Sequence, residues 1–164
     1  HCDLKPGNIL AAAGTVRLLD FGIARLLETP DGARTTTGVA PVTPDYCSPE
    51  QVRGEPVTTR TDVHALGLVL YELLTGARGQ QADPSSPRAL EHSVCEVEVT
   101  APSLRVRGHD RALARQIAGD LDTIVLTATQ RDPARRYGSV AALADDLRRH
   151  LDARPVRARR DSPW

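Results

Sequence analysis

Apolar residues recur at helical spacing in three segments of the chain. Residues 59–75 are apolar on most faces, and Gly76 follows as a residue suited to a helix C-cap. A helix that is apolar nearly all round is buried, so this segment is predicted to be the central helix of the fold. Residues 120–130 and 139–151 are predicted to form two further helices, the second with Ser139 as its N-cap.

Two short apolar runs near the start of the chain have a different pattern. Residues 9–11 and 16–19 flank an Ala-Gly pair, which is typical of a β-hairpin. The two outer ends of a hairpin lie side by side. We therefore expect Asn8 and Asp20 to be neighbours.

Polar segments separate these elements. Residues 24–49 are rich in Thr, Gly and Pro without an apolar period, which predicts a long exposed loop of the kind that is functional or disordered. Residues 77–87 read as a surface loop and 88–95 as a short helix. Residues 152–164 are polar and rich in Arg and Pro, so we expect them to leave the fold as a solvated linker or tail.

Composition places the chain among globular proteins. Its 164 residues are 40% hydrophobic and 26% charged. The 21 basic and 21 acidic residues balance, so we expect neither nucleic acid nor a membrane surface as a partner. No stretch approaches the roughly 20 apolar residues that span a bilayer, although a membrane anchor elsewhere in a longer protein is compatible with this sequence. Three scattered cysteines favour a reducing, cytoplasmic location.

The chemistry is concentrated in two short motifs. The chain begins with the letters HCDLKPGN, and Asp20 opens the letters DFG. An aspartate, an asparagine five residues later and a second aspartate supply one proton acceptor and two oxygen ligands for Mg²⁺. This order resembles the signature of protein kinases, HRDLxxxN followed by DFG. The letters TPDYCSPE at residues 43–50 resemble the segment that ends that family's activation loop on Ala-Pro-Glu.

The resemblance extends from the first residue to about Leu151 and implies a fold. It predicts a mainly α (α+β) domain, the C-terminal lobe of a bacterial-type serine/threonine kinase over residues 1–151, with a small β-hairpin at the catalytic cleft. Residues 152–164 then form the tail.

The resemblance also implies site residues, with ATP and Mg²⁺ as cofactors. Asp3 would accept or orient the proton of the substrate hydroxyl, and Lys5 would lie beside the transferring phosphoryl group. Asn8 and Asp20 would hold Mg²⁺ and, with Lys5, bind the nucleotide. Thr43 resembles the threonine that serine/threonine kinases place beside the catalytic Asp and Lys. Each residue taken singly is also a common turn or surface residue.

Further positions match structural parts of the family. Glu50 is expected to pair with Arg136 as a buried ion pair. Asp62 is expected to accept backbone N–H groups from the catalytic loop, the alternative being a carboxylate that only favours the start of its helix. His64 stands where the family more often has an aromatic residue, and we interpret it as a packing residue.

Cys2 departs from the family pattern. It replaces the arginine that commonly receives a phosphorylated activation-loop side chain, which weakens the expectation of such control. Arg25 matches another basic position able to meet a phosphate. Candidate phosphorylation sites, or simply polar surface residues, are Thr35, Thr36 and Thr37.

Two function classes follow from this reading. The first is a serine/threonine protein kinase that transfers the γ-phosphoryl group of Mg-ATP to Ser/Thr hydroxyls of protein substrates. The second is a noncatalytic pseudokinase or truncated fragment that serves as a binding or scaffold module. Intact motif residues favour the first, and a GTPase is disfavoured because no Walker loop is present.

The chain opens on the first residue of the motif and contains no methionine. We therefore expect it to be part of a larger protein that carries the Gly-rich loop, the strand lysine and the glutamate partner of that lysine. Residues 1–164 alone are expected to bind Mg-ATP poorly and to be inactive.

Overall fold

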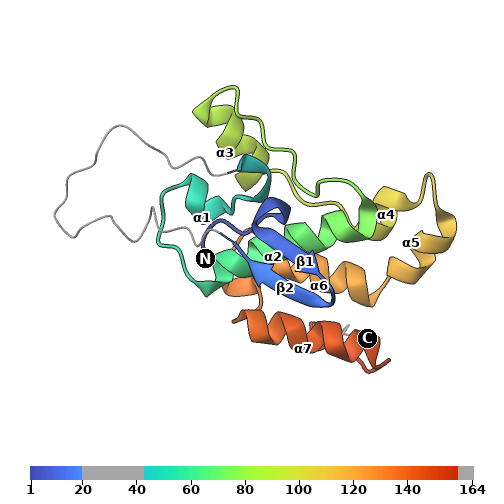
Figure 1. The fold of residues 1–164 in the computed structure, drawn as a ribbon. Coiled ribbons are helices and arrows are strands. Elements are labelled where there is room, and N and C mark those ends of the chain that lie inside the picture. Colours follow the sequence, from blue (N-terminus) through green and yellow to red (C-terminus); the bar gives the residue numbers. More distant parts are fainter. Residues whose placement is uncertain (20–42, 159–164) are drawn as a thin grey trace.

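The computed structural model of the chain describes residues 1–19 and 43–158. These residues form a mainly helical fold with one two-stranded antiparallel sheet, as the sequence predicts (Figure 1). In chain order the elements are η1 (Pro6–Asn8), β1 (Ile9–Ala12), β2 (Thr15–Leu18), η3 (Pro44–Tyr46), α1 (Pro49–Val52), α2 (Thr59–Thr75), α3 (Pro87–Cys95), α4 (Pro102–Val106), α5 (Arg111–Ile117), α6 (Asp120–Ala128), η4 (Pro133–Arg135) and α7 (Val140–Leu151).

Helix α2 is the central element, with the bounds that the apolar pattern predicts. It packs against α4, α6 and α7 and crosses the middle of the described fold (Figure 1). The Thr58 hydroxyl caps its start by accepting from the backbone N–H of Arg60 at 3.2 Å. Gly76 ends it in the left-handed region at φ 67°. One face still meets solvent, since Leu73 is 78% exposed.

The largest core cluster joins α2 to the last helices of the chain. Gly67 allows the close approach of α2 to α6, because a Cβ atom there would lie 2.8 Å from the Cβ of Ala128. The buried members of this largest cluster are Val63, Ile124, Ala128, Tyr137, Leu143 and Val156.

The predicted helices at residues 88–95, 120–130 and 139–151 are confirmed as α3, α6 and α7, with small differences at the ends.

Helices α4 and α5 are absent from the sequence prediction. They contain five and seven residues, too few for a helical period to stand out. Their local signals are Pro102 in the first turn of α4 and Asp110, whose carboxylate accepts from the N–H of Leu113 at 2.8 Å. Each hides a few apolar side chains, such as Val106 and Ile117, in a second cluster.

The predicted β-hairpin is confirmed. Strands β1 and β2 pair antiparallel with Ile9 opposite Leu18, and the turn residues Ala13 and Gly14 both have positive φ values. Beyond the last pair, the N–H of Leu19 donates to the carbonyl of Asn8 at 2.8 Å.

The segment after α7 does not leave the fold where expected. Val156 is 3% exposed within the core, and the N–H groups of Arg157 and Ala158 donate to the two carboxylate oxygens of Asp146 at 2.7 and 2.9 Å. The Asp146 carboxylate is fully buried and needs donors, which the tail supplies. The prediction of a solvated tail is therefore wrong for Val156 and for the backbone of residues 157 and 158. Residues 159–164 lie outside the described residues.

Among the helices that the structure describes, none is both long and apolar enough to cross a lipid bilayer.

Candidate active site

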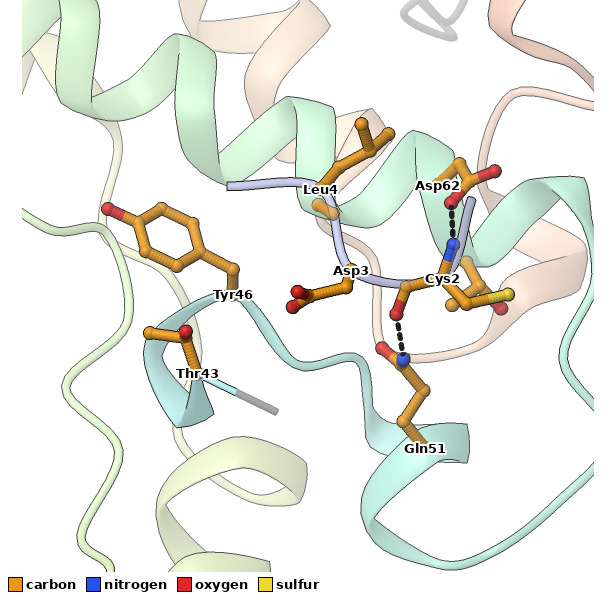
Figure 2. Close-up of a pocket in the computed structure, with 9 residues that line it drawn as sticks. Cys2, Asp3, Leu4, Thr43, Tyr46, Gln51 and Asp62 are labelled. Atoms are coloured by element: carbon orange, nitrogen blue, oxygen red, sulfur yellow. Dashed lines mark hydrogen bonds between the residues drawn. The ribbon is translucent and has the colours of Figure 1, made fainter. Parts of the chain in front are cut away.

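The first residues of the chain lie against the start of α2. One Asp62 oxygen accepts from the backbone nitrogen of His1 and the other accepts from the N–H of Cys2, each at 2.9 Å. Figure 2 shows the bond to Cys2. Cys2 has φ 66°, a left-handed conformation that is uncommon for a residue with a side chain. The expectation that Asp62 accepts N–H groups from this loop is confirmed.

Gln51, on α1, holds the opposite side of the same residue. Its Nε2 donates to the carbonyl oxygen of Cys2 at 2.8 Å (Figure 2). Sequence reasoning missed this contact, because it joins residues 49 positions apart and belongs to no recognised motif spacing.

The structure brings Asp3, Lys5 and Asn8 together. Lys5 Nζ lies 2.9 Å from Asp3 Oδ2, and the Nδ2 of Asn8 donates to the same oxygen at 3.0 Å and to the Asp3 carbonyl at 2.8 Å. The one-turn helix η1, with Pro6 in its first position, folds the chain back so that Asn8 reaches Asp3.

Thr43 and Asp3 line one small cavity, and the Asp3 carboxylate points toward the segment that carries Thr43 and Tyr46 (Figure 2). The side chain of Asp3 is 28% exposed, which leaves it accessible to a substrate group. The Lys5 ammonium and the Asn8 amide nitrogen both contact Oδ2 of Asp3, so Oδ1 of Asp3 remains for a substrate hydroxyl.

Asp20 lies outside the described residues, as do Arg25 and the threonines at 35–37. The hairpin nevertheless brings Leu19, the residue before Asp20, to the backbone of Asn8. The Asn8 amide uses its nitrogen for both contacts with Asp3, and its Oδ1 makes no hydrogen bond to another described residue. A free amide oxygen in this position suits a hard cation such as Mg²⁺.

The segment after Thr43 is anchored by residues that the sequence analysis did not single out. The hydroxyl of Tyr46 donates to Glu72 on α2, and burial together with this contact raises the pKa of Tyr46 to about 12. Gln80 Nε2 donates to the carbonyls of Pro44 and Cys47, each at 3.1 Å. These bonds hold η3 in place beside Asp3.

The predicted ion pair between Glu50 and Arg136 is confirmed. Nη1 and Nη2 of Arg136 donate to the two carboxylate oxygens of Glu50 at 2.7 and 2.8 Å. The side chain of Glu50 is 3% exposed and that of Arg136 is 0% exposed. Thr61 donates to the same carboxylate at 2.8 Å. Burial is the largest single influence and would raise the pKa of Glu50. The hydrogen bonds and charge of Arg136, with a backbone hydrogen bond and the bond from Thr61, together outweigh burial and lower this pKa to about 2.

His64 is a buried packing residue, as interpreted from the sequence. It is 2% exposed, and its Nδ1 has no partner among the residues described. Burial and the nearby charge of Arg136 lower the pKa of His64 to about 3, so the ring is neutral at neutral pH.

Comparison with known proteins agrees with this geometry. The family described as "Protein kinase domain" matches residues 1–148. The probable serine/threonine-protein kinase CE0033 of Corynebacterium efficiens is 40% identical over 167 residues, which cover 99% of this chain and 24% of the relative. The serine/threonine-protein kinases PknB of Mycobacterium tuberculosis and Mycobacterium leprae are 37% and 38% identical over 159 residues, 96% of this chain and 24% of each relative.

The chain thus spans about a quarter of the length of the curated relatives it matches. The match to the family covers most of the chain, including the loop from His1 to Asn8 and the ion pair of Glu50 with Arg136. The chain belongs to the protein kinase domain family, with bacterial serine/threonine kinases as relatives, and its described residues have the helical fold of the C-terminal lobe of that domain.

Proposed function

We propose that the complete protein transfers the γ-phosphoryl group of Mg-ATP to serine and threonine hydroxyls of protein substrates. The observation that carries this proposal is the convergence of Lys5 Nζ and Asn8 Nδ2 on one oxygen of Asp3, at 2.9 and 3.0 Å, beside a cavity that Thr43 also lines. Phosphoryl transfer depends mainly on alignment and on neutralisation of developing charge, and this cluster supplies both.

Each member of the cluster has a separate part in the proposal. Asp3 orients the substrate hydroxyl and takes its proton through the oxygen that faces the cavity. Lys5 places a positive charge beside the transferring group, at a distance set by its contact with Asp3. Thr43 lines the same cavity and is proposed to help hold Asp3 and Lys5 in register.

The donor set also fits the cofactors. Asn8 Oδ1 and the Asp20 carboxylate would hold Mg²⁺, which neutralises charge on the phosphate oxygens when bound. Asn8 keeps its oxygen available because its nitrogen is committed to Asp3.

A serine/threonine preference rests on Lys5 and Thr43 and on the printed names of the relatives. A cytoplasmic location is part of the proposal because the reaction consumes ATP and because three scattered cysteines are too few for a disulfide framework.

The test is radiolabel transfer from γ-labelled ATP to a peptide library with serine or threonine acceptors, using the complete protein. Asp3→Asn is expected to lower the rate about 100-fold or more, because it removes the proton acceptor. The melting temperature should stay close to wild type. Asp152→Asn, an exposed change just after α7, is the matched control and should leave transfer unchanged.

Undiminished transfer by Asp3→Asn would contradict the role of Asp3. Absence of transfer from the wild-type protein, with folding intact, would favour the noncatalytic scaffold alternative.

A further inference from the structure

The backbone of Cys2 is held from two sides by side chains of two helices. Its N–H donates to Asp62 at the start of α2, at 2.9 Å, and its carbonyl accepts from Gln51 on α1, at 2.8 Å (Figure 2). Asp3 is the next residue, and the peptide whose carbonyl Gln51 binds also contains the nitrogen of Asp3. Because the peptide is planar, a rotation of it moves the Cα of Asp3 and with it the carboxylate.

We propose that Gln51 is a positioning residue for Asp3, through its hydrogen bond to the Cys2 carbonyl. The inference rests on the proposed function, in which Asp3 orients the substrate hydroxyl. Cys2 has a φ of 66°, which residues with a side chain rarely adopt without support from their surroundings. Asp62 supports only the N–H side of this residue. Gln51 supports the carbonyl side.

Gln51 is itself held in one orientation. Its Oε1 accepts from the backbone N–H of Ser48 at 3.0 Å and from the Ser48 hydroxyl at 3.2 Å. With the oxygen committed to two donors, the Nε2 group faces Cys2. The amide therefore connects the start of α1 to the catalytic loop with both of its ends in use.

The position of α1 is fixed in turn by the neighbouring residue. Glu50 is bound by Arg136 through two hydrogen bonds of 2.7 and 2.8 Å in a fully buried setting. The ion pair therefore fixes the position of α1. Gln51, on the same helix, then fixes the position of the Cys2 carbonyl, which precedes Asp3 in the chain. Because the contact uses the carbonyl of residue 2, it does not depend on the side chain there, and Cys2 serves as well as arginine.

The test compares Gln51→Glu with wild type in the complete protein. Glutamate keeps an oxygen for Ser48 but replaces the donor to Cys2 with a second oxygen, which repels the carbonyl. We expect kcat to fall about tenfold to a hundredfold, while KM for ATP and for the peptide stays within about twofold, since small misplacement of a reacting group affects the chemical step.

Glu55→Gln, an exposed change three residues after the end of α1, is the matched control. It exchanges a carboxylate and an amide, as Gln51→Glu does, at a side chain outside the contacts of Gln51 with Ser48 and Cys2. Its kcat should match wild type. An unchanged kcat in Gln51→Glu, or an equal loss in Glu55→Gln, would overturn the proposal.

A second readout does not depend on activity. Iodoacetamide labelling, followed by peptide mass spectrometry, reports the accessibility of the Cys2 thiol, which should rise when the backbone of that residue is released, and the buried Cys47 and Cys95 serve as internal references. Gln51→Leu removes the donor to the Cys2 carbonyl without adding a negative charge, which would disfavour the reactive thiolate. It should speed labelling of Cys2 several-fold without changing the two references. Equal acceleration at all three cysteines would indicate general unfolding and would refute a local role.

The two readouts separate this proposal from the proposed function. A wild-type protein without phosphoryl transfer contradicts the function, while selective labelling of Cys2 in Gln51→Leu still supports the positioning role of Gln51. Unchanged Cys2 labelling contradicts that role whether or not the protein transfers phosphoryl groups.

Discussion

Arg136 is the residue on which several separate segments depend. Besides both oxygens of Glu50, its guanidinium binds the carbonyls of Gln130, Arg131 and Arg60 at 2.6, 3.0 and 3.0 Å. A charge buried so completely is tolerated because every donor has an acceptor. The value of this pair lies less in net stability than in fixing where α1 meets the rest of the fold.

Arg136→Met should destabilise the complete protein by about 3–5 kcal/mol, because Glu50 is left buried without its partner. Urea unfolding at pH 7 measures the loss. The double variant Glu50→Gln with Arg136→Met should recover a large part of it. If the double variant is as unstable as the single one, the stranded carboxylate is not the cause.

The low pKa of Glu50 sets the sign of its pH dependence. The folded value of about 2 lies below the ordinary value of 4.5, so its contribution is present above about pH 4.5 and is lost as the pH falls toward 2. His64 acts at higher pH. Its folded pKa of about 3 lies below 6.5, so the unfolded chain binds more protons and stability falls as the pH drops below 6.5.

His64→Phe should therefore flatten the stability profile between pH 6.5 and 4.5. The gap between the two proteins is expected to shift by about 2 kcal/mol over this interval, since one proton contributes about 1.4 kcal/mol per pH unit. Denaturant titrations at four pH values measure this shift, and the other histidines cancel in the comparison. Parallel stability profiles of the two proteins would show that the pKa of His64 is not lowered by folding.

At the scale of elements, Gly67 lets α2 and α6 pack closely against each other in the core. A Cβ atom on Gly67 would lie 2.8 Å from the Ala128 Cβ and 2.9 Å from Cγ2 of Thr129. Both atoms belong to well-buried residues, which have little room to move.

Gly67→Ala should lower the free energy of unfolding by about 1–2 kcal/mol. Helix propensity favours alanine by about 1 kcal/mol, but overpacking costs about 1–3 kcal/mol, so the clash is expected to dominate. Thermal unfolding measures the difference. Gly108→Ala, where nothing lies within 4 Å of the added carbon, is the control and should change stability little.

At the scale of the whole molecule, the end of the lobe lies beyond the last helix. The stretch that follows α7 returns to bury Val156 and to place two N–H groups on Asp146, which also accepts from the hydroxyl of Tyr137 at 3.0 Å. The boundary at residue 151 remains a prediction about domain division, but Val156 lies in the core and Ala158 packs against it.

A protein that ends at residue 151 should be less stable than one that ends at residue 158, by about 3 kcal/mol. Loss of Val156 costs about 1.5–3 kcal/mol, and the loss of two N–H donors to the buried Asp146 adds about 1–3 kcal/mol, partly offset by water that reaches the carboxylate. Paired denaturation curves of the two lengths measure it. Equal midpoints would mean that the tail packs without stabilising the lobe.

The sequence by itself determined the family resemblance, the hairpin and the longer helices. The order of Asp3, Lys5 and Asn8 is local, and a helix as long as α2 repeats its pattern often enough to be read from one sequence. Short elements such as α4 and α5 lack that repetition, and their burial depends on neighbours brought in by the fold.

Only the tertiary structure decided the contacts between distant residues. Three arrangements join positions whose spacing carries no periodic signal: the bond from Gln51 to Cys2, the cavity that Thr43 and Asp3 both line, and the packing of Val156 in the core. Even the ion pair of Glu50 with Arg136 was foreseen by resemblance and not by spacing, since the two residues are 86 positions apart. Hydrogen bonding and burial act on proximity in space, which local sequence patterns encode only within one element.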